Sequence, residues 1–208
     1  MTSHSNLTSA LGRRLAYKRI PGKGPEIVFL SGFKSDMEGT KALHLAHWAK
    51  VNGRSFLRFD YSGHGQSSGL FGDGCIGDWL ADAEAVITSL TEGPVILVGS
   101  SMGGWISLLL SQRLGARLVG LVTIAAAPDF TEDTIWASFD THQRSELQRN
   151  GQVFLPSDYD EPYVITQRLI EDGRQNLVLR APLPLPCSVR FLQGTADVDV
   201  NVSVALRL

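Results

Sequence analysis

Short apolar runs recur along the chain, and a segment long enough for a helix separates most of them from the next. The runs are EIVFLS (26–31), RSFLRFD (54–60), PVILVGS (94–100), LVGLVTIAA (118–126) and CSVRFLQG (187–194). A strand that is apolar along its whole length is buried on both faces, as in a parallel sheet covered by helices on both sides. We therefore predict an α/β fold with a mostly parallel sheet, in which all five runs are buried strands.

Two further regions complete the predicted arrangement. RRLAYKRI (13–20) is typical of an edge strand that follows a polar tail. Residues 129–180 interrupt the alternation with a predicted helix at 131–151, an extended piece and a second helix at 163–173. We interpret this insertion as a lid over the carboxyl ends of the strands, within one domain that spans residues 1–208.

The composition limits the classes of partner. The 208 residues are 43% hydrophobic and 19% charged, and the formal net charge is −2. With this charge balance we expect no strongly positive surface that would attract nucleic acid or anionic lipid. No apolar stretch approaches the roughly 20 residues of a membrane helix. We expect a small-molecule or acylated substrate, no nucleic acid and no membrane span, and association into a homodimer is left open.

The N-terminal segment and the cysteines indicate the cellular compartment in which we expect the protein. The first 20 residues lack the apolar core of a secretory signal, although Ser, Thr and Arg without an acid before Glu26 leave a weak organelle-targeting interpretation open. Cys75 and Cys187 are too few for a disulfide framework, and neither belongs to a metal-binding pair. A reducing compartment fits best, and we expect a cytoplasmic protein.

The segment Gly99-Ser100-Ser101-Met102-Gly103 joins an apolar strand to an apolar helix. G-x-S-x-G in this context is the nucleophile elbow, a sharp turn whose flanking positions must be small. Glycines flank Ser101 in this way, whereas Val98 and Met102 would flank Ser100. Ser101 is therefore the predicted catalytic nucleophile.

Acyl transfer also needs two main-chain N–H donors that stabilise a developing oxyanion. One is predicted to be the N–H of Met102, which follows the nucleophile. The other is predicted to be the N–H of Phe33, in the loop LSGFKSD that follows an earlier strand. Phe33 would act through its backbone, so we expect its side chain to matter little.

The expected catalytic acid follows the last predicted strand. Asp197 lies in the turn of FLQGTADVDV, where a carboxylate can orient an imidazole. Asp199 is expected to face solvent or cap a helix, and Asp129, after LVGLVTIAA, is the second choice for the acid.

The triad histidine is not found in the chain as given, because no histidine follows Asp197. We expect VNVSVALRL to open a helix, and we hypothesise that the base belongs to a further helix–strand portion that this chain lacks. His64 is expected to fix its own loop, and His44 and His47 to lie on a solvated helix face. His4 is placed in the tail and His142 in the lid.

Aromatic side chains accompany the elbow helix and the lid. They are Trp105, Trp136, Phe139, Phe154, Tyr159 and Tyr163. Most are expected to pack the lid against the sheet, and any that face the cleft would suit an apolar acyl or aryl group. No motif for a phosphate, metal or cofactor is found, so no cofactor is expected.

Four stretches together resemble the α/β-hydrolases: FLSGFKSDMEGTKA, LRFDYSGHGQSSG, GSSMGGW and QGTADVDV. The resemblance covers roughly residues 15 to 208. Within that superfamily the chain resembles the group around the mitochondrial palmitoyl-protein thioesterase, which is also described as an acyl-glucuronide esterase. The resemblance implies the α/β-hydrolase fold, Ser101 as nucleophile, Asp197 as acid, and Phe33 and Met102 as oxyanion donors.

Three functions remain open at this stage. The first is a serine hydrolase that cleaves carboxylic esters or thioesters through an acyl-enzyme. The second is a non-catalytic binding protein on the same fold, which the absent histidine favours. The third is another chemistry of this fold, such as acyl transfer or cofactor-free haloperoxidase activity.

Overall fold

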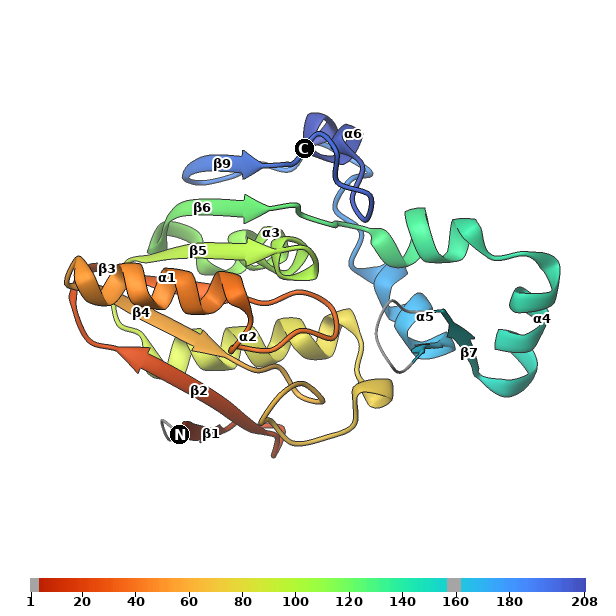
Figure 1. Cartoon of the computed structure of the whole chain (residues 1–208), viewed down its shortest axis with the longest axis horizontal. Coiled ribbons are helices and arrows are strands. Elements are labelled where there is room, and N and C mark those ends of the chain that lie inside the picture. The colour runs from red at the N-terminus through yellow and green to blue at the C-terminus, as the bar shows by residue number, and fades with distance from the viewer. Residues whose placement is uncertain (1–3, 157–161) are drawn as a thin grey trace.

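The computed structural model describes residues 4–156 and 162–208 and contains a seven-stranded sheet in the order β1-β2-β4-β3-β5-β6-β9 (Figure 1). The two pairs β1–β2 and β2–β4 are antiparallel and the other four are parallel. The predicted α/β-hydrolase fold with a mostly parallel sheet is confirmed. The strands are β1 (Ser5–Thr8), β2 (Arg14–Ile20), β3 (Lys23–Leu30), β4 (Arg54–Phe59), β5 (Val95–Ser100), β6 (Leu118–Ile124) and β9 (Ser188–Leu192).

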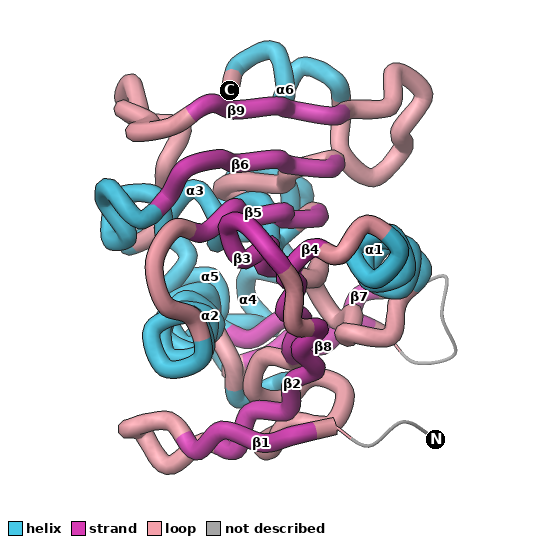
Figure 2. Tube along the Cα trace, turned by 90° about the vertical axis from the view of Figure 1, so that its left-hand side faces the viewer, coloured by secondary structure: helices cyan, strands magenta, loops and turns pink. Residues whose placement is uncertain are grey.

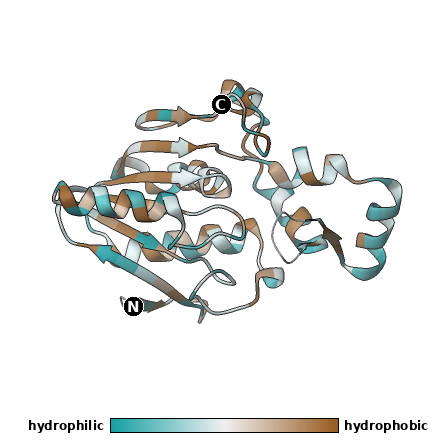
Figure 3. Ribbon diagram, viewed as in Figure 1, coloured by the Kyte–Doolittle hydropathy of each residue, from teal (hydrophilic) through white to brown (hydrophobic). Residues whose placement is uncertain are grey.

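Helices cover both faces of this sheet. Figure 2 shows α1 (Thr40–Val51) on one side and α2 (Ile76–Leu90) with α3 (Met102–Leu114) on the other. Alternate residues of β3 serve the two layers: Val28 and Leu30 pack with α2 and α3, whereas Ile27 and Phe29 pack with α1. Burial on both faces explains the uninterrupted apolar strands, whose hydrophobic colouring is evident at the centre of Figure 3.

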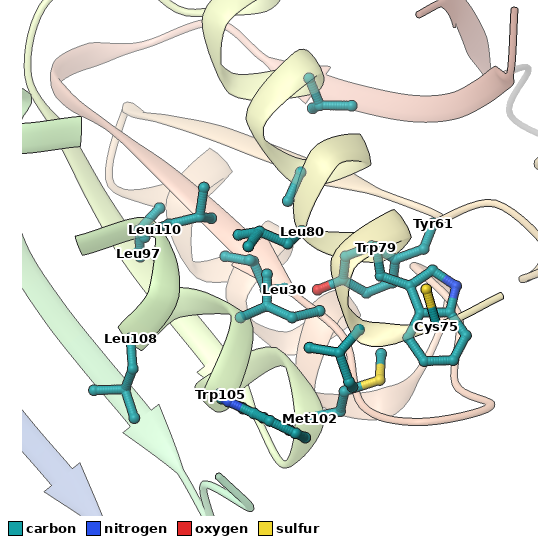
Figure 4. Packing of buried hydrophobic residues seen from close by; sticks show 14 of the residues in the cluster. Leu30, Tyr61, Cys75, Trp79, Leu80, Leu97, Met102, Trp105, Leu108 and Leu110 are labelled. Carbon is teal, nitrogen blue, oxygen red and sulfur yellow. The ribbon is translucent and has the colours of Figure 1, made fainter. Parts of the chain in front are cut away.

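The larger core layer lies between the sheet and helices α2 and α3. Figure 4 shows Trp79, Tyr61 and Cys75 gathered at one end of this layer and Trp105 at another. All four side chains are at most 2% exposed. Burial of such large side chains fixes the positions of the strand ends that carry the candidate site.

Two predictions about the sheet edges are wrong. The strand at 13–20 is not an edge, because β1 pairs outside β2, with Ser5 opposite Tyr17. Strand β9 is not buried, because its exposed and half-buried residues alternate and it pairs only with β6 among the described residues. A run of apolar residues therefore indicated the strand correctly but not its depth in the sheet.

The described residues of the range 129–180, which we call the lid segment, lie beside the carboxyl ends of β5 and β6 in Figure 1. The helix predicted at 131–151 is two helices, a π-helical turn η3 (Thr131–Trp136) and α4 (Thr141–Asn150). The break comes at Asp140, whose side chain accepts from the Gln143 N–H and so caps α4. Gly151, with φ of 72°, ends that helix as predicted.

The helix predicted at 163–173 begins later than expected. Its first four residues form β8 (Tyr163–Thr166), which pairs antiparallel with β7 (Gln152–Leu155). Only then does α5 (Gln167–Gln175) follow, capped by the Thr166 hydroxyl. The β-branched Val164, Ile165 and Thr166 favour the strand once a partner is available.

Three short helical elements remain. These are the 3₁₀ turns η1 (Phe71–Asp73) and η2 (Gly115–Arg117), and the helix α6 (Val202–Arg207). The helix expected after Asp197 is present, and Asn201 caps it. Asp199 is exposed, which confirms the first of the two roles expected of it, a side chain that faces solvent rather than one that caps a helix. Within the described ranges, no helix is both long and apolar enough to span a bilayer.

Candidate active site

Ser101 occupies a strained turn between β5 and α3, with φ of 51° and ψ of −118°. Side chains other than glycine rarely adopt this region of backbone conformation. Main-chain hydrogen bonds hold it there. The Ser101 N–H donates to Ile124 O at 3.0 Å, and Ser101 O accepts from the N–H groups of Gly104 at 2.9 Å and Ala127 at 3.1 Å. The sequence folds into this turn because β6 and the first turn of α3 satisfy both main-chain groups.

The flanking glycines are required by close backbone approach. A Cβ atom on Gly99 would overlap the carbonyl oxygen of Gly103, and one on Gly103 would overlap that of Leu30. If Ser100 were the nucleophile, the two positions that must be small would be occupied by Val98 and Met102. Ser100 is instead a buried strand residue opposite Ile124, whereas Ser101 is half-buried.

The two predicted oxyanion donors lie in segments that meet at this turn. A Cβ atom on Gly32 would lie 3.3 Å from the Ser101 Cβ, so the loop carrying Phe33 approaches the serine closely. In the described part of the chain, neither the Phe33 N–H nor the Met102 N–H has an acceptor. Both N–H groups therefore keep their donor capacity, and the positive end of α3 favours negative charge near Ser101.

Asp197 lies in the turn after β9. Its Oδ1 accepts from the Asp199 N–H at 3.0 Å and from the Val200 N–H at 2.9 Å. Oδ2 has no partner among the described residues, and the side chain is half-buried. The carboxylate is therefore held in place by one oxygen and keeps the other for a further donor such as an imidazole.

Asp129, the second choice for the acid, has a different role. It is fully buried after β6, and its two oxygens accept from the Val178 N–H at 2.8 Å and the Leu179 N–H at 2.9 Å. Arg180 lies 3.4 Å away as an ion pair. Asp129 thus joins the first residues of the lid segment to its last ones, which disfavours it as the triad acid.

None of the five histidines hydrogen-bonds to Ser101 or Asp197 within the part of the chain that the structure describes. His44 and His47 are exposed on α1, as expected, and His142 is exposed on α4. His4 is half-buried near the N-terminus.

His64 is buried inside its own loop. Its Nδ1 lies 3.1 Å from Ser62 O, and its ring contacts the rings of Tyr61, Phe71 and Trp79. Burial lowers the pKa of His64 below its usual value. Nε2 has no partner among the described residues, so this histidine is not the base for Ser101 in this structure.

The aromatic residues expected near the cleft separate into several groups. Trp105 is fully buried and donates from Nε1 to Asn176 O, and Phe139 is also buried. The guanidinium groups of Arg144 and Arg174 lie 4.9 Å and 4.6 Å from the centre of the Trp136 ring.

Phe154 is half exposed, and Tyr159 lies outside the described residues. Tyr163 lies against Phe33, with ring centroids 5.9 Å apart. Of the five aromatic residues in this set that the structure describes, Tyr163 is thus the one whose ring contacts the Phe33 ring directly.

The sequence reasoning missed the aromatic cluster around Phe33. The Phe33 ring contacts Phe71 at 4.8 Å, Phe130 at 5.4 Å and Trp79 at 5.9 Å, in addition to Tyr163. This packing gives the Phe33 side chain contacts that the sequence-based expectation did not include. No local pattern could have revealed it, because the partners lie far apart along the chain.

Two grooves on the described residues do not touch Ser101. The larger, about 490 Å³, is lined mostly by apolar side chains of residues 178–185 and of Leu108, Phe191 and Leu208, together with Arg180 and Arg207. The smaller, about 330 Å³, is lined by Arg13, Asp78 and other polar residues. Within the described ranges, no three His, Cys, Asp or Glu side chains gather in a way that could hold a metal ion.

Comparison with known proteins identifies the family. Residues 25–159 match the model of the family described as "Serine aminopeptidase, S33". The chain belongs to this family of α/β-hydrolases. The matched range contains the Ser101 turn and the Phe33 loop, and family membership makes the protein a relative of serine hydrolases.

Individual relatives support the narrower resemblance. The mitochondrial palmitoyl-protein thioesterase ABHD10 of Rattus norvegicus is 37% identical over 185 residues, which are 88% of this chain and 62% of the relative. The chain thus spans about three fifths of the length of the curated relatives of this group that it matches. The predicted similarity to this thioesterase group is confirmed.

Solved structures also support this similarity and the α/β-hydrolase fold. A crystal structure of a presumed hydrolase from Agrobacterium vitis S4 superposes with a TM-score of 0.94 at 42% identity, over 99% of this chain and 84% of that one. Mouse α/β-hydrolase domain-containing protein 10 superposes with a TM-score of 0.89 at 34% identity, over 99% and 83% of the two chains.

Proposed function

We propose that this protein is a serine esterase or thioesterase that cleaves carboxylic esters or thioesters through an acyl-enzyme on Ser101. The observation that carries the proposal is the strained turn at Ser101, held by main-chain bonds to Ile124 and Gly104 between a parallel strand and a helix N-terminus. Strain of this kind persists where the surrounding structure imposes it, and it presents the hydroxyl at a fixed place.

The proposed reaction has two steps. Ser101 Oγ attacks the carbonyl carbon as a base removes its proton, and the N–H groups of Phe33 and Met102 donate to the oxyanion. Collapse expels the alcohol or thiol, which receives the proton, and leaves an acyl group on Ser101. Water then attacks this acyl group through a second oxyanion and releases the carboxylic acid.

The base is the component that the described residues do not supply. In a Ser–His–Asp arrangement the acid accepts from the imidazole, and Asp197 Oδ2 has the free capacity for that role. In the proposed mechanism the base is a histidine that donates to Asp197 Oδ2.

The substrate class rests on similarity. The rat relative is named a palmitoyl-protein thioesterase, which supports acyl thioesters and esters as the substrates proposed here. A cytoplasmic location and a homodimer stay predictions, and so does the single domain with its inserted lid.

Hydrolysis of p-nitrophenyl butyrate and of a butyryl thioester by the full-length gene product tests the proposal. We expect turnover that Ser101→Ala reduces by at least about 10⁴-fold, because loss of a nucleophile removes the covalent route. Ser100→Ala is the matched control and should keep activity within about threefold, since Ser100 lies in the strand. Absence of turnover in a folded full-length protein would favour the binding-protein alternative and contradict the proposal.

A further inference from the structure

The Phe33 side chain joins the core of the molecule to the lid segment. Its ring contacts Phe71 and Trp79, which belong to the core side, at centroid distances of 4.8 and 5.9 Å. On the lid side it contacts Phe130 at 5.4 Å and Tyr163 at 5.9 Å. The contacts with Phe71, Trp79 and Phe130 have the edge-to-face geometry that aromatic rings favour. Together these five rings form what we call the Phe33 cluster.

The main chain of the same residue lies beside the nucleophile. Gly32 approaches Ser101 so closely that an added Cβ would lie 3.3 Å from the serine Cβ. The later part of the loop is tied down, because the Ser35 N–H donates to Gly32 O and the Met37 N–H donates to Asp60 Oδ1 at 2.7 Å. Among the described residues no acceptor holds the Phe33 N–H itself.

We propose that Phe33 is a positioning residue whose ring, held in the Phe33 cluster, aims its own N–H at the oxyanion of the reaction on Ser101. The inference rests on the proposed function and adds a role for a side chain to a site that otherwise uses only the backbone there. Preorganised donors stabilise an oxyanion because no reorganisation is needed as charge develops. Two of the five rings, Phe130 and Tyr163, come from the lid segment, so the lid contributes to the placement of this donor.

The contacts of the lid with this loop involve a second residue. The Lys34 Nζ lies 5.5 Å from the centre of the Tyr163 ring, and Lys34 has a positive φ of 56°. The two consecutive residues Phe33 and Lys34 therefore both meet Tyr163, and removal of that ring should loosen the loop from the lid side. Tyr163→Ala tests this without altering the loop itself.

Steady-state kinetics of the full-length gene product on p-nitrophenyl acetate provide the test, because a two-carbon acyl group makes little demand on an acyl-binding surface. We expect Phe33→Ala to lower kcat by about 10- to 100-fold with KM nearly unchanged, since loss of one oxyanion donor costs about 10²–10³. Phe33→Tyr keeps the ring and should restore most of the activity. The pH dependence of the rate should be unaffected, because no step of the proposal involves the base.

A double-mutant cycle separates positioning from simple packing. Tyr163→Ala should lower kcat in the same way, and Phe33→Ala with Tyr163→Ala should be little worse than Phe33→Ala alone, because both remove the same contact. Tyr163→Phe keeps the ring and should behave as wild type. Trp136→Ala, a lid aromatic that packs on Arg144 and Arg174, is the control whose effect should be additive with Phe33→Ala.

Several results would overturn the inference. A Phe33→Ala protein with unchanged kcat would do so, as would one in which only KM rises, because the ring would then be a binding surface. If Phe33→Ala does not fold, the test is the comparison of Tyr163→Ala with Tyr163→Phe. Equal kcat values for these two variants would reject the positioning role of the Phe33 ring. If Ser101→Ala abolishes activity but the Phe33 and Tyr163 variants leave kcat unchanged, only this inference is rejected. If activity persists in Ser101→Ala, the proposed function is rejected.

Discussion

Asp129 and Asp197 follow neighbouring parallel strands at the same edge of the sheet, yet their surroundings differ. Asp129 is fully buried, and both of its oxygens accept from the main chain of residues 178 and 179. Asp197 is half-buried and uses one oxygen, within its own turn. The same residue type in equivalent places thus holds the lid segment in one case and keeps acceptor capacity in the other.

The difference shows that spare hydrogen-bonding capacity, rather than position after a strand, distinguishes a candidate catalytic carboxylate. The donors to Asp129 come from a segment about fifty residues further along the chain. They occupy lone pairs that a catalytic histidine would need. Two experiments test this assignment of roles, and a third compares two aspartates of α2 whose surroundings also differ.

The largest expected effect is the loss of catalysis in Asp197→Asn. The amide oxygen can still accept from the Asp199 and Val200 N–H groups, so the melting temperature should change little. In the full-length gene product we expect kcat to fall by about 10³–10⁴-fold, as when the acid of a Ser–His–Asp triad is made neutral. Rates within about threefold of wild type would remove Asp197 from the mechanism.

Asp129→Ala should reduce stability instead. It leaves the Val178 and Leu179 N–H groups buried or half-buried without their acceptors, and we expect a loss of about 3 kcal/mol in the free energy of unfolding. That corresponds to a melting temperature lower by about 10 °C for a chain of this size.

The matched control for Asp129 is Asp133→Ala. Asp133 pairs with the same Arg180, at 2.5 Å, but both side chains are more than one third exposed. An exposed pair of this kind contributes about 0–1 kcal/mol, so the control should melt close to wild type. Equal losses in the two variants would show that the Asp129 contacts do not hold the lid segment.

The smallest effect concerns two aspartates of α2 that share Arg13. Asp82 is fully buried, and burial raises its pKa above 3.8 although Ser62 and Arg13 act in the opposite direction. Burial also raises the pKa of Asp78, but hydrogen bonds from Arg168 and Cys75 outweigh it and leave that pKa below 3.8. The two carboxylates therefore affect the pH dependence of stability with opposite signs.

The signs follow from proton binding. When the pKa of a group is higher in the folded than in the unfolded protein, the group stabilises the fold below the unfolded pKa, and this stability is lost as the pH rises through the folded pKa. When the folded pKa is lower, the group stabilises the fold above the unfolded pKa, and this stability is lost as the pH falls through the folded pKa. Asp82→Asn should therefore gain stability relative to wild type as the pH rises from about 4, by at most about 1.4 kcal/mol per pH unit. Asp78→Asn should instead approach wild type as the pH falls below about 4, and urea unfolding at several pH values measures both. The same sign for both variants would contradict this reading of the two environments.

Much of the fold could be predicted because its signals are local. The apolar runs gave all five parallel strands, and the glycines around Ser101 distinguished it from Ser100, since each residue needed only its neighbours for the argument. Strand β8 was mistaken for the start of a helix because its conformation depends on pairing with β7, which lies about ten residues earlier in the chain.

The parts of the site that escaped prediction depend on distant residues. The buried donors to Asp129 and the rings around Phe33 come together only in the folded chain, from the core and from the lid segment. The exposure of β9 likewise reflects which strands pair with it, and its own sequence does not encode that.

Reaction of the full-length gene product with a fluorophosphonate, followed by mass spectrometry of the labelled peptide, tests the central claim most directly. We predict one adduct, with fragment ions that assign it to Ser101. Labelling should be lost in Ser101→Ala and kept in Ser100→Ala. An adduct on Ser100 or at another site, or no adduct in a folded protein, would contradict the assignment of Ser101 as the nucleophile.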